Sequence, residues 1–408
     1  MTGTKKLKIV NDPIYGFITI PSELIYNLIE HPYFQRLRRI SQMGMSYLVY
    51  PGAHHTRLHH ALGAMFLMQR AVQVLRSKGV EISENEAQDL YIAILLHDIG
   101  HGPFSHAMEN SIVEGISHEE ISLLFMNLLN EEFNGKLDGA IKIFKKECPR
   151  KFMHQLVSGQ LDMDRLDYLR RDSFYTGVTE GNVSSQRLIA MLDVYNDSLV
   201  VEEKGIYSVE KFIVARRFMY WQVYLHKTSL VAEQLLLGVL KRAKQLSIKG
   251  EKLPASKALS FFLNKTSEKD DFSSSILAIF SKLDDTDILS ALKSWEHHKD
   301  LVLSRISKML LYRKLLKIKM SNQPFSIEKL MESRLKFMSQ HNLSLEEASY
   351  FVFTGEISNQ AYRMDKENIF LLKKNGKLMD VAKASDQLNI EALSKTVVKH
   401  YLCYPKKE

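Results

Sequence analysis

Apolar residues recur at intervals of three and four positions along most of this sequence, which is the spacing of one face of an α-helix. The pattern begins near residue 22 and is interrupted at His31-Pro32. The stretch 249–300 is helical but more polar, so we expect it to be an appended or mobile part, and a basic helix is expected over 300–319. The pattern predicts a mainly α protein, with further helices over residues 58–77, 84–99, 104–113, 118–131, 162–171, 184–194 and 208–245.

Short β-prone segments interrupt the helical pattern near both ends of the chain and in its middle. Residues 6–20 predict a strand pair that turns at Asn11-Asp12-Pro13. A mid-chain hairpin is expected to pair Ser198–Glu202 with Ile206-Tyr207 across Lys204-Gly205. Near the C-terminus, Asn375-Gly376 is the preferred pair for a type I′ turn. It predicts a hairpin of residues 369–372 with 378–381, which a last strand over Val397–Tyr404 follows.

Length and composition narrow the class of protein. The 408 residues permit two domains or one large helical body with small appendages. No stretch approaches the roughly 18 apolar residues that cross a bilayer, so no membrane partner and a cytoplasmic location are expected. Cys148 and Cys403 are the only cysteines, too few for a disulfide framework or a Cys-rich zinc site. A net charge of +8 favours phosphorylated small molecules or nucleic acid as partners, although a plain basic surface fits equally well.

An adjacent His97-Asp98 pair follows the apolar run of residues 92–96, where buried ionisable groups need a partner. One neutral imidazole and one carboxylate can enter the same coordination sphere of a divalent cation. His60 upstream and Asp164 downstream would complete a His-His-Asp-Asp set. Mixed nitrogen and oxygen ligands suit Mn, Fe, Mg, Zn or Ni. Eight of the 15 histidines lie between residues 54 and 118, which favours a metal site there.

The segment after this pair carries candidate acid and base groups. Two glycines and a proline in residues 100–106 predict a tight bend before the next helix. His106 and Glu109 are three residues apart, so on a helix the carboxylate can orient the imidazole as a general acid. His118-Glu119 adds a second imidazole and carboxylate. Each histidine alone is more typical of a structural role, but their clustering favours catalysis.

These motifs together resemble the HD-domain deoxynucleoside triphosphate triphosphohydrolases, a family that includes the vertebrate sterile-alpha-motif HD-domain enzyme. The resemblance covers roughly residues 6–320. It implies an HD-domain helical bundle with small β-hairpins. Residues 1–245 would form the catalytic core with an N-terminal nucleotide and oligomer segment, and residues 246–408 a helical region that ends in a small β element. The matching segments are residues 8–16, 33–44, 56–63, 97–106, 118–119, 162–168, 224–227 and 311–317.

The resemblance also implies a reaction, in which a dNTP is hydrolysed to deoxynucleoside and intact triphosphate. The four metal ligands would be His60, His97, Asp98 and Asp164. His106 would protonate the departing 5′ oxygen, and Glu109 stands where the family commonly has a shorter Asp. The remaining roles are phosphate contacts by His101, His118 and Arg216, with Arg57 or Lys227 in some members, sugar recognition by Gln42, Tyr168 and Asp172, and a position near sugar and base for Tyr224.

A regulatory nucleotide site at a subunit interface is a further implication of the resemblance. A (d)GTP-type activator would promote assembly of a homo-oligomer, from dimer to tetramer. Glu30 replaces a shorter Asp, which leaves guanine selectivity open. For Gln35 and Arg38, an ordinary exposed helix face is the alternative. The aligned positions are Lys8, Asn11, Glu30, Gln35 and Arg38.

Two other functions remain compatible with the sequence. The first is another HD phosphohydrolase that acts on nucleoside monophosphates, cyclic dinucleotides or guanosine tetraphosphate, because pocket shape sets the substrate. The second is a regulator that binds nucleic acid weakly through the basic stretch 305–319, with a structural metal.

Overall fold

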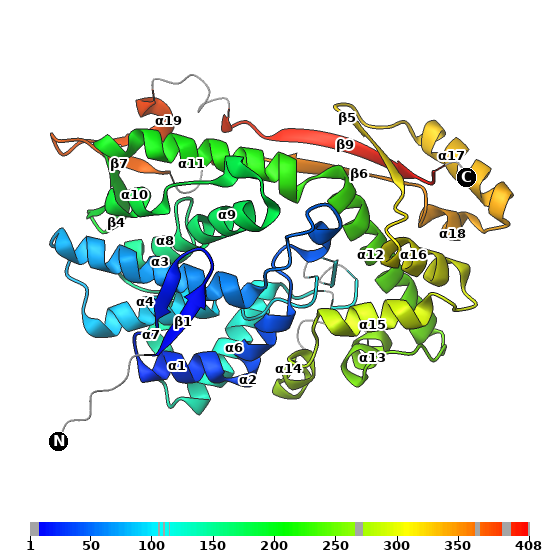
Figure 1. Ribbon diagram of the computed structural model, residues 1–408, viewed down its shortest axis with the longest axis horizontal. Coiled ribbons are helices and arrows are strands. Elements are labelled where there is room, and N and C mark those ends of the chain that lie inside the picture. Colours follow the sequence, from blue (N-terminus) through cyan, green and yellow to red (C-terminus); the bar gives the residue numbers. More distant parts are fainter. Residues whose placement is uncertain are drawn as a thin grey trace.

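The computed structural model describes residues 8–104, 107–108, 111–113, 115–265, 272–363, 368–385 and 393–406. Helices make up most of these residues, and small sheets lie near the N-terminus, in mid-chain and near the C-terminus (Figure 1). The predicted mainly α fold class is therefore confirmed. In the described part of the chain, no helix is both long and apolar enough to cross a lipid bilayer.

The N-terminal segment is an antiparallel strand pair followed by short helices. Strands β1 (Ile9–Asp12) and β2 (Gly16–Thr19) pair as predicted. Helix α1 (Glu23–Glu30) starts at the N-cap Ser22, whose side chain accepts a hydrogen bond from the Ile25 amide. After the predicted interruption at His31-Pro32 come α2 (Pro32–Gln35) and the 3₁₀ turns η1 (Arg36–Arg39) and η2 (Gly44–Leu48).

Helix α3 (Arg57–Ser77) is the centre of the helical body and packs against α4 (Glu84–Leu96) and α9 (Met163–Thr176). Helix α4 ends at Leu96 rather than at the predicted residue 99, so Asp98 lies beyond the helix. The predicted helix over 104–113 includes positions outside the described residues. The next helices of this body are α6 (His118–Glu132), α7 (Asp138–Phe144) and α8 (Lys151–Val157).

The mid-chain hairpin differs from the prediction. Helix α10 (Ser185–Ala190) ends early, and β3 (Leu192–Tyr195) pairs with β4 (Ser198–Glu202). The turn is Asn196-Asp197, whose φ angles of 47° and 58° are left-handed. Asn and Asp tolerate that conformation, which a two-residue hairpin turn requires. The predicted turn at Lys204-Gly205 is wrong: it belongs to the 3₁₀ turn η4 (Glu203–Gly205), which precedes the next helix.

The predicted long helix over 208–245 is also wrong, because it is broken. Helix α11 (Ile206–Met219) passes into a π-helical turn, η5 (Tyr220–Tyr224), and α12 (Lys227–Ile248) then starts again. The side chain of His226 caps α12 by accepting a hydrogen bond from the Thr228 amide. Between α9 and α10, η3 (Thr179–Gly181) forms one further 3₁₀ turn.

The helices after α12 are part of the body, so the expectation of an appended segment is wrong. Helices α13 (Lys257–Asn264), α14 (Ser274–Phe280) and α15 (Asp285–Trp295) bury the side chains of Phe262, Phe280 and Trp295 in the common core. The predicted basic helix over 300–319 is shorter than expected. It ends with α16 (Leu301–Leu311), and β5 (Lys317–Ser321) follows as a strand.

A three-stranded antiparallel sheet in the order β5-β9-β6 closes the C-terminal region. It contains β6 (Phe353–Asn359) and the predicted last strand β9 (Val397–Tyr404), after α17 (Ile327–His341) and α18 (Leu345–Ser349). The predicted hairpin is confirmed as β7 (Phe370–Leu372) with β8 (Leu378–Asp380), ahead of α19 (Val381–Ala384). Strand β7 joins β4 in parallel, across the predicted division at residue 245. That division stays a prediction.

Candidate metal centre and catalytic cavity

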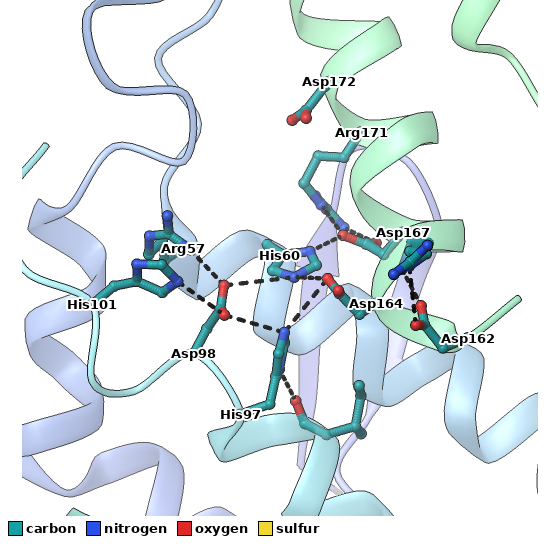
Figure 2. Close-up of polar contacts among 12 residues, drawn as sticks. Arg57, His60, His97, Asp98, His101, Asp162, Asp164, Asp167, Arg171 and Asp172 are labelled. Carbon is teal, nitrogen blue, oxygen red and sulfur yellow. Dashed lines mark hydrogen bonds and ion pairs between the residues drawn. The ribbon is translucent and has the colours of Figure 1, made fainter. Parts of the chain in front are cut away.

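Three of the predicted metal ligands meet in one cluster. Each of His60, His97 and Asp164 offers a ligand atom, and these atoms lie within 4.8 Å of one another. His60 comes from the first turns of α3, His97 from the end of α4 and Asp164 from the start of α9 (Figure 2). The Oδ1 atom of Asp164 is 3.0 Å from Nε2 of His60 and 3.5 Å from Nε2 of His97.

Hydrogen bonds fix the ring orientation of both histidines. Nδ1 of His97 donates to the carbonyl oxygen of Ile94 over 2.7 Å, and Nδ1 of His60 donates to Oδ2 of Asp167 over 2.7 Å. Both Nε2 atoms are buried, and neither makes a hydrogen bond to the described part of the chain. Imidazoles held through Nδ1 with Nε2 turned to a shared carboxylate match the ligand arrangement of a divalent cation. The residues present therefore fit a metal ion.

Asp98, the predicted fourth ligand, borders the cluster. Its Oδ1 is 3.4 Å from Nε2 of His97, and its Oδ2 is 3.9 Å from Nε2 of His60. Arg57 donates from Nη1 to the same Oδ2 over 2.5 Å, and Nε2 of His101 is 3.2 Å from Oδ1 (Figure 2). Its role as a ligand stays a prediction, since Arg57 holds one of its two oxygens.

The titration of these groups reflects close opposite charges. Burial by itself lowers the pKa of His60, but the adjacent carboxylates of Asp164 and Asp167 raise it to about 10. Burial likewise raises the pKa of Asp164, yet the adjacent imidazoles of His60 and His97 hold it below its ordinary range. Burial and then the charge of Arg57 lower the pKa of His101, which is therefore neutral at pH 7.

A buried chain of ion pairs behind His60 was not predicted. Asp167 accepts hydrogen bonds from Nε and Nη2 of Arg171 over 2.9 and 3.0 Å, and Nη1 of Arg171 donates to Asp12 over 2.8 Å. This chain links α9 to β1 and stabilises the ionised carboxylate that holds His60. The spacing of four residues between Asp167 and Arg171 was a usable local signal, but nothing local pointed to Asp12.

The loop from His97 to His101 is also held from outside. The hydroxyl of Ser122 on α6 donates to the carbonyl oxygen of His97 over 2.8 Å and accepts from the amide of Gly100 over 2.9 Å. Arg36, fully buried, donates to the carbonyl oxygens of Ile99 and His101. Neither support was predicted, because each joins segments that are far apart in the chain.

The predicted catalytic histidines are placed only in part. The ring of His101 stacks on that of His118, with centroids 3.9 Å apart. His118 is the first residue of α6, directly after the capping residue Ser117. His106 and Glu109 lie outside the described residues, so their predicted roles as acid and orienting carboxylate stay predictions.

A cavity of about 510 Å³ adjoins the metal cluster. Asp172 accepts hydrogen bonds from Nε2 of His55 and from the Tyr224 hydroxyl, both over 2.7 Å. The π-helical turn η5 contributes Tyr220 and Tyr224 to the wall. Five residues of the predicted substrate set line the cavity, namely Gln42, Arg57, Tyr168, Asp172 and Tyr224, and so do the unpredicted Glu233, Gln234, Glu356 and Tyr401.

Two predicted phosphate contacts, Arg216 and Lys227, lie outside the lining of this cavity as far as the structure describes it. Arg216 is buried, donates from Nη1 to the carbonyl oxygen of Ala361 over 3.0 Å and lies over the ring of Tyr220. Lys227 is exposed at the start of α12. Neither is among the described residues that line the cavity.

The predicted activator residues gather around β1 and α1. Lys8 lies over the ring of Tyr26, Asn11 is on β1, and Glu30 ends α1. Gln35 donates to the carbonyl oxygen of Ile29 and accepts a hydrogen bond from Nε of Arg38, each over 2.7 Å. Their role in nucleotide binding stays a prediction.

The chain is similar to two family models and to several known proteins. Residues 57–171 match the HD domain, and residues 183–261 match the HD associated region. The chain is 31% identical to the uncharacterized protein YwfO of Bacillus subtilis, over 98% of this chain and 92% of that protein. The crystal structure of a phosphohydrolase from Bacteroides thetaiotaomicron is 53% identical, covers 98% of this chain and has a TM-score of 0.95.

Part of the chain is also similar to proteins whose names include a substrate. The deoxynucleoside triphosphate triphosphohydrolase SAMHD1 homolog of Dictyostelium discoideum is 30% identical over 60% of this chain and 51% of that protein. The human protein SAMHD1 is 28% identical over 58% of this chain. The matched HD domain includes His60, His97, Asp98 and Asp164. Together with the near full-length relatives and the histidine and carboxylate cluster, these matches show that the chain belongs to the HD-domain family of metal-dependent phosphohydrolases.

Proposed function

We propose that this phosphohydrolase converts a dNTP to deoxynucleoside and inorganic triphosphate. The observation that carries the proposal is the cavity next to the metal cluster. It extends from Arg57, which contacts Asp98, to the polar and aromatic side chains of Tyr168, Asp172 and Tyr224. Such a cavity suits a phosphorylated sugar with an attached base. The partial likeness to proteins named dNTP triphosphohydrolases supports the same substrate.

The reaction requires that a phosphate oxygen be polarised and that a water be activated. A divalent cation on His60, His97, Asp164 and Asp98 would supply both. Arg57 offsets charge on the phosphates from the cavity wall. As the water oxygen bonds to the α-phosphorus, the bond from that phosphorus to the 5′ oxygen breaks. His106 donates its proton to the 5′ oxygen, and Glu109 orients its ring.

The choice of sugar would depend on the part of the cavity wall formed by Tyr168, Asp172 and Tyr224. The hydrogen bonds from His55 and Tyr224 hold the Asp172 carboxylate in a fixed position, ready to accept from a sugar hydroxyl. The ring of Tyr168 lies at 75° to that of Tyr224, with centroids 6.1 Å apart. We propose that Tyr168 packs under the 2′ carbon, where a hydroxyl group would collide with it, and that Gln42 contacts the sugar.

Regulation by a (d)GTP-type nucleotide at Lys8, Asn11, Glu30, Gln35 and Arg38 is the second part of the proposal. The exposed side chains of Glu30 and Arg38 suit a ligand shared with another subunit of a homo-oligomer. Addition of GTP should raise the turnover of other dNTPs and the sedimentation coefficient. If neither changes, this part of the proposal fails.

Product analysis by ion-exchange chromatography tests the activity. The protein is incubated with each dNTP and each NTP in the presence of Mn, Mg or Fe, with and without GTP. The expected products are deoxynucleoside and intact triphosphate, and they should be absent with Asp164→Ala. Tyr168→Ala should admit NTPs more readily. Turnover only of nucleoside monophosphates, cyclic dinucleotides or guanosine tetraphosphate would replace the proposed substrate with one of these.

A further inference from the structure

A second cavity, of about 720 Å³, lies in the C-terminal region. It is bordered by α16, α17, β5 and the residues that follow β9. Figure 1 places α17 and the end of β9 together at one end of the molecule, away from α3 and α4. Among the described residues, none lines both this cavity and the cavity next to the metal cluster.

Positive charge dominates the lining of this second cavity. It contains Arg305, Lys317, Lys336 and Lys406, and among its described lining residues there is no aspartate or glutamate. The three lysines are exposed and make no ion pair with the described part of the chain. They come from β5, from α17 and from the segment after β9, so cations border the cavity from separate elements. A recess of this kind attracts a polyanion.

An aromatic side chain lies beside these cations. Tyr404 pairs directly with Lys317 across β5 and β9, so the two side chains are on the same face of the sheet. Tyr401, three positions earlier on β9, points to the other face and lines the catalytic cavity. The half-buried Tyr404 therefore offers a ring to a base whose phosphates contact Lys317 and its neighbours.

We propose that this cavity, formed around Lys317, Lys336, Lys406 and Tyr404, binds single-stranded nucleic acid. Cationic grooves that follow the phosphate backbone, together with an aromatic ring for stacking, are the general means of holding an unpaired strand. In a duplex the bases are paired inside the helix, so only the backbone could contact the cavity. An unpaired nucleotide could also place its base in the cavity. The binding site is independent of the proposed hydrolysis.

Fluorescence anisotropy with a labelled single strand of about 15 nucleotides tests the proposal. The charge-reversal variant K317E/K336E/K406E is compared with K136E/K211E/K374E, which changes net charge equally at exposed lysines outside the cavity. The cavity variant should bind at least about tenfold more weakly, and the slope of log affinity against log salt should fall by about 2. The control variant should keep most of the affinity and the slope.

Tyr404→Ala provides a second, uncharged variant that should weaken the single strand more than a duplex of the same length. Thermal unfolding establishes that each variant is folded, and phosphohydrolase activity should be unchanged in the cavity variant. Equal loss of affinity in both triple variants would show that net charge alone attracts the strand and would overturn the proposal. Wild-type affinity in the cavity variant, equal binding of duplex and strand, or displacement of the strand by equimolar inorganic triphosphate would do so too.

Discussion

The guanidinium of Arg36 donates a hydrogen bond from Nη1 to the backbone carbonyl oxygen of His101 over 2.8 Å. Its Nη2 donates to the carbonyl oxygen of Ile99 over 2.7 Å, and the residue is 1% exposed. Burial lowers its pKa from 12.5 to about 9. The rings of Phe125 and Phe280 flank the cation. Arg36 therefore holds the loop that carries Asp98 by backbone contacts alone.

Replacement of Arg36 by alanine should lower the free energy of unfolding by about 3–5 kcal/mol, because buried carbonyl oxygens lose their donors and a large side chain leaves a cavity. Urea unfolding measures this change. Arg70→Ala, at an exposed arginine of α3, is the matched control and should change stability by less than about 1 kcal/mol. A comparable loss for both variants would contradict the assigned role of Arg36.

Asp167→Asn should weaken divalent metal binding by about 10–100-fold, because Asp167 orients His60 and the amide no longer offers a charged acceptor. Isothermal titration calorimetry with Mn or Zn measures the affinity. Asp172→Asn is the matched control: it removes a buried carboxylate from the same helix, one that contacts His55 and Tyr224 instead. If both variants bound metal as the wild type does, the proposed orientation of His60 by Asp167 would be wrong.

Gly100→Ala should disrupt the site. A Cβ atom at Gly100 would lie 2.2 Å from the carbonyl oxygen of His118 and 2.2 Å from the amide nitrogen of Ser122. Both are backbone atoms of α6, so the helix and the loop must separate. We expect a loss of at least about 2 kcal/mol in unfolding free energy, with weaker metal binding.

Gly238→Ala, inside α12, is the control for Gly100→Ala. The nearest atom to its Cβ, on the ring of Tyr350, is 3.4 Å away, which is ordinary contact. The substitution should be neutral or stabilise the protein by up to about 1 kcal/mol, because alanine favours a helix over glycine. Denaturant unfolding measures the stability of both variants. If Gly100→Ala were the more stable of the two, the assigned role of Gly100 would be wrong.

The carboxyl group of Asp89 should make stability depend on pH. Burial, and then the charges of Glu86 and Asp138, raise its pKa from 3.8 to about 6. The protonated form is favoured in the folded state, so this contribution to stability is complete below about pH 4 and is lost as the pH rises through 6. Asp89→Asn should therefore raise the thermal midpoint above pH 6 by about 1–2 °C, since the group is partly exposed and solvent screens it.

Glu202→Gln is the comparison for Asp89→Asn, because the contribution of Glu202 to stability should depend on pH in the opposite direction. Although partial burial raises the pKa of Glu202, hydrogen bonds from Lys204 and Lys78 lower it overall. Its contribution is present at neutral pH and is lost on acidification, so the variant should be less stable than the wild type at pH 7. Differential scanning calorimetry from pH 5 to 8 compares the two variants. A constant difference between Asp89→Asn and wild type over this range would refute the assignment.

The spacing of apolar residues was enough to predict α3, α6 and the start of α9, because a helix with one buried side repeats that side every three or four residues. The turn Asn375-Gly376 likewise predicted its hairpin. The sequence did not reveal the strand that pairs with β4. Both Asn196-Asp197 and Lys204-Gly205 can turn a chain. In the structure the strand that pairs with β4 is β3, in which Leu192 is buried. The break at Tyr220–Tyr224 left the apolar pattern intact.

In the candidate site, too, some features could be predicted from the sequence and others could not. His97 and Asp98 are neighbours in the chain, and His60 and Asp164 lie in short polar motifs beside apolar runs, so their residue types and positions indicated a metal site. Tertiary structure alone decided that Asp12 pairs with Arg171, that Arg36 holds the loop at His101 and that Tyr401 lines the cavity. These contacts join residues that are far apart in the sequence. A single hydrogen bond or ion pair between distant segments leaves no periodic pattern, and its partner is known only once the chain has folded.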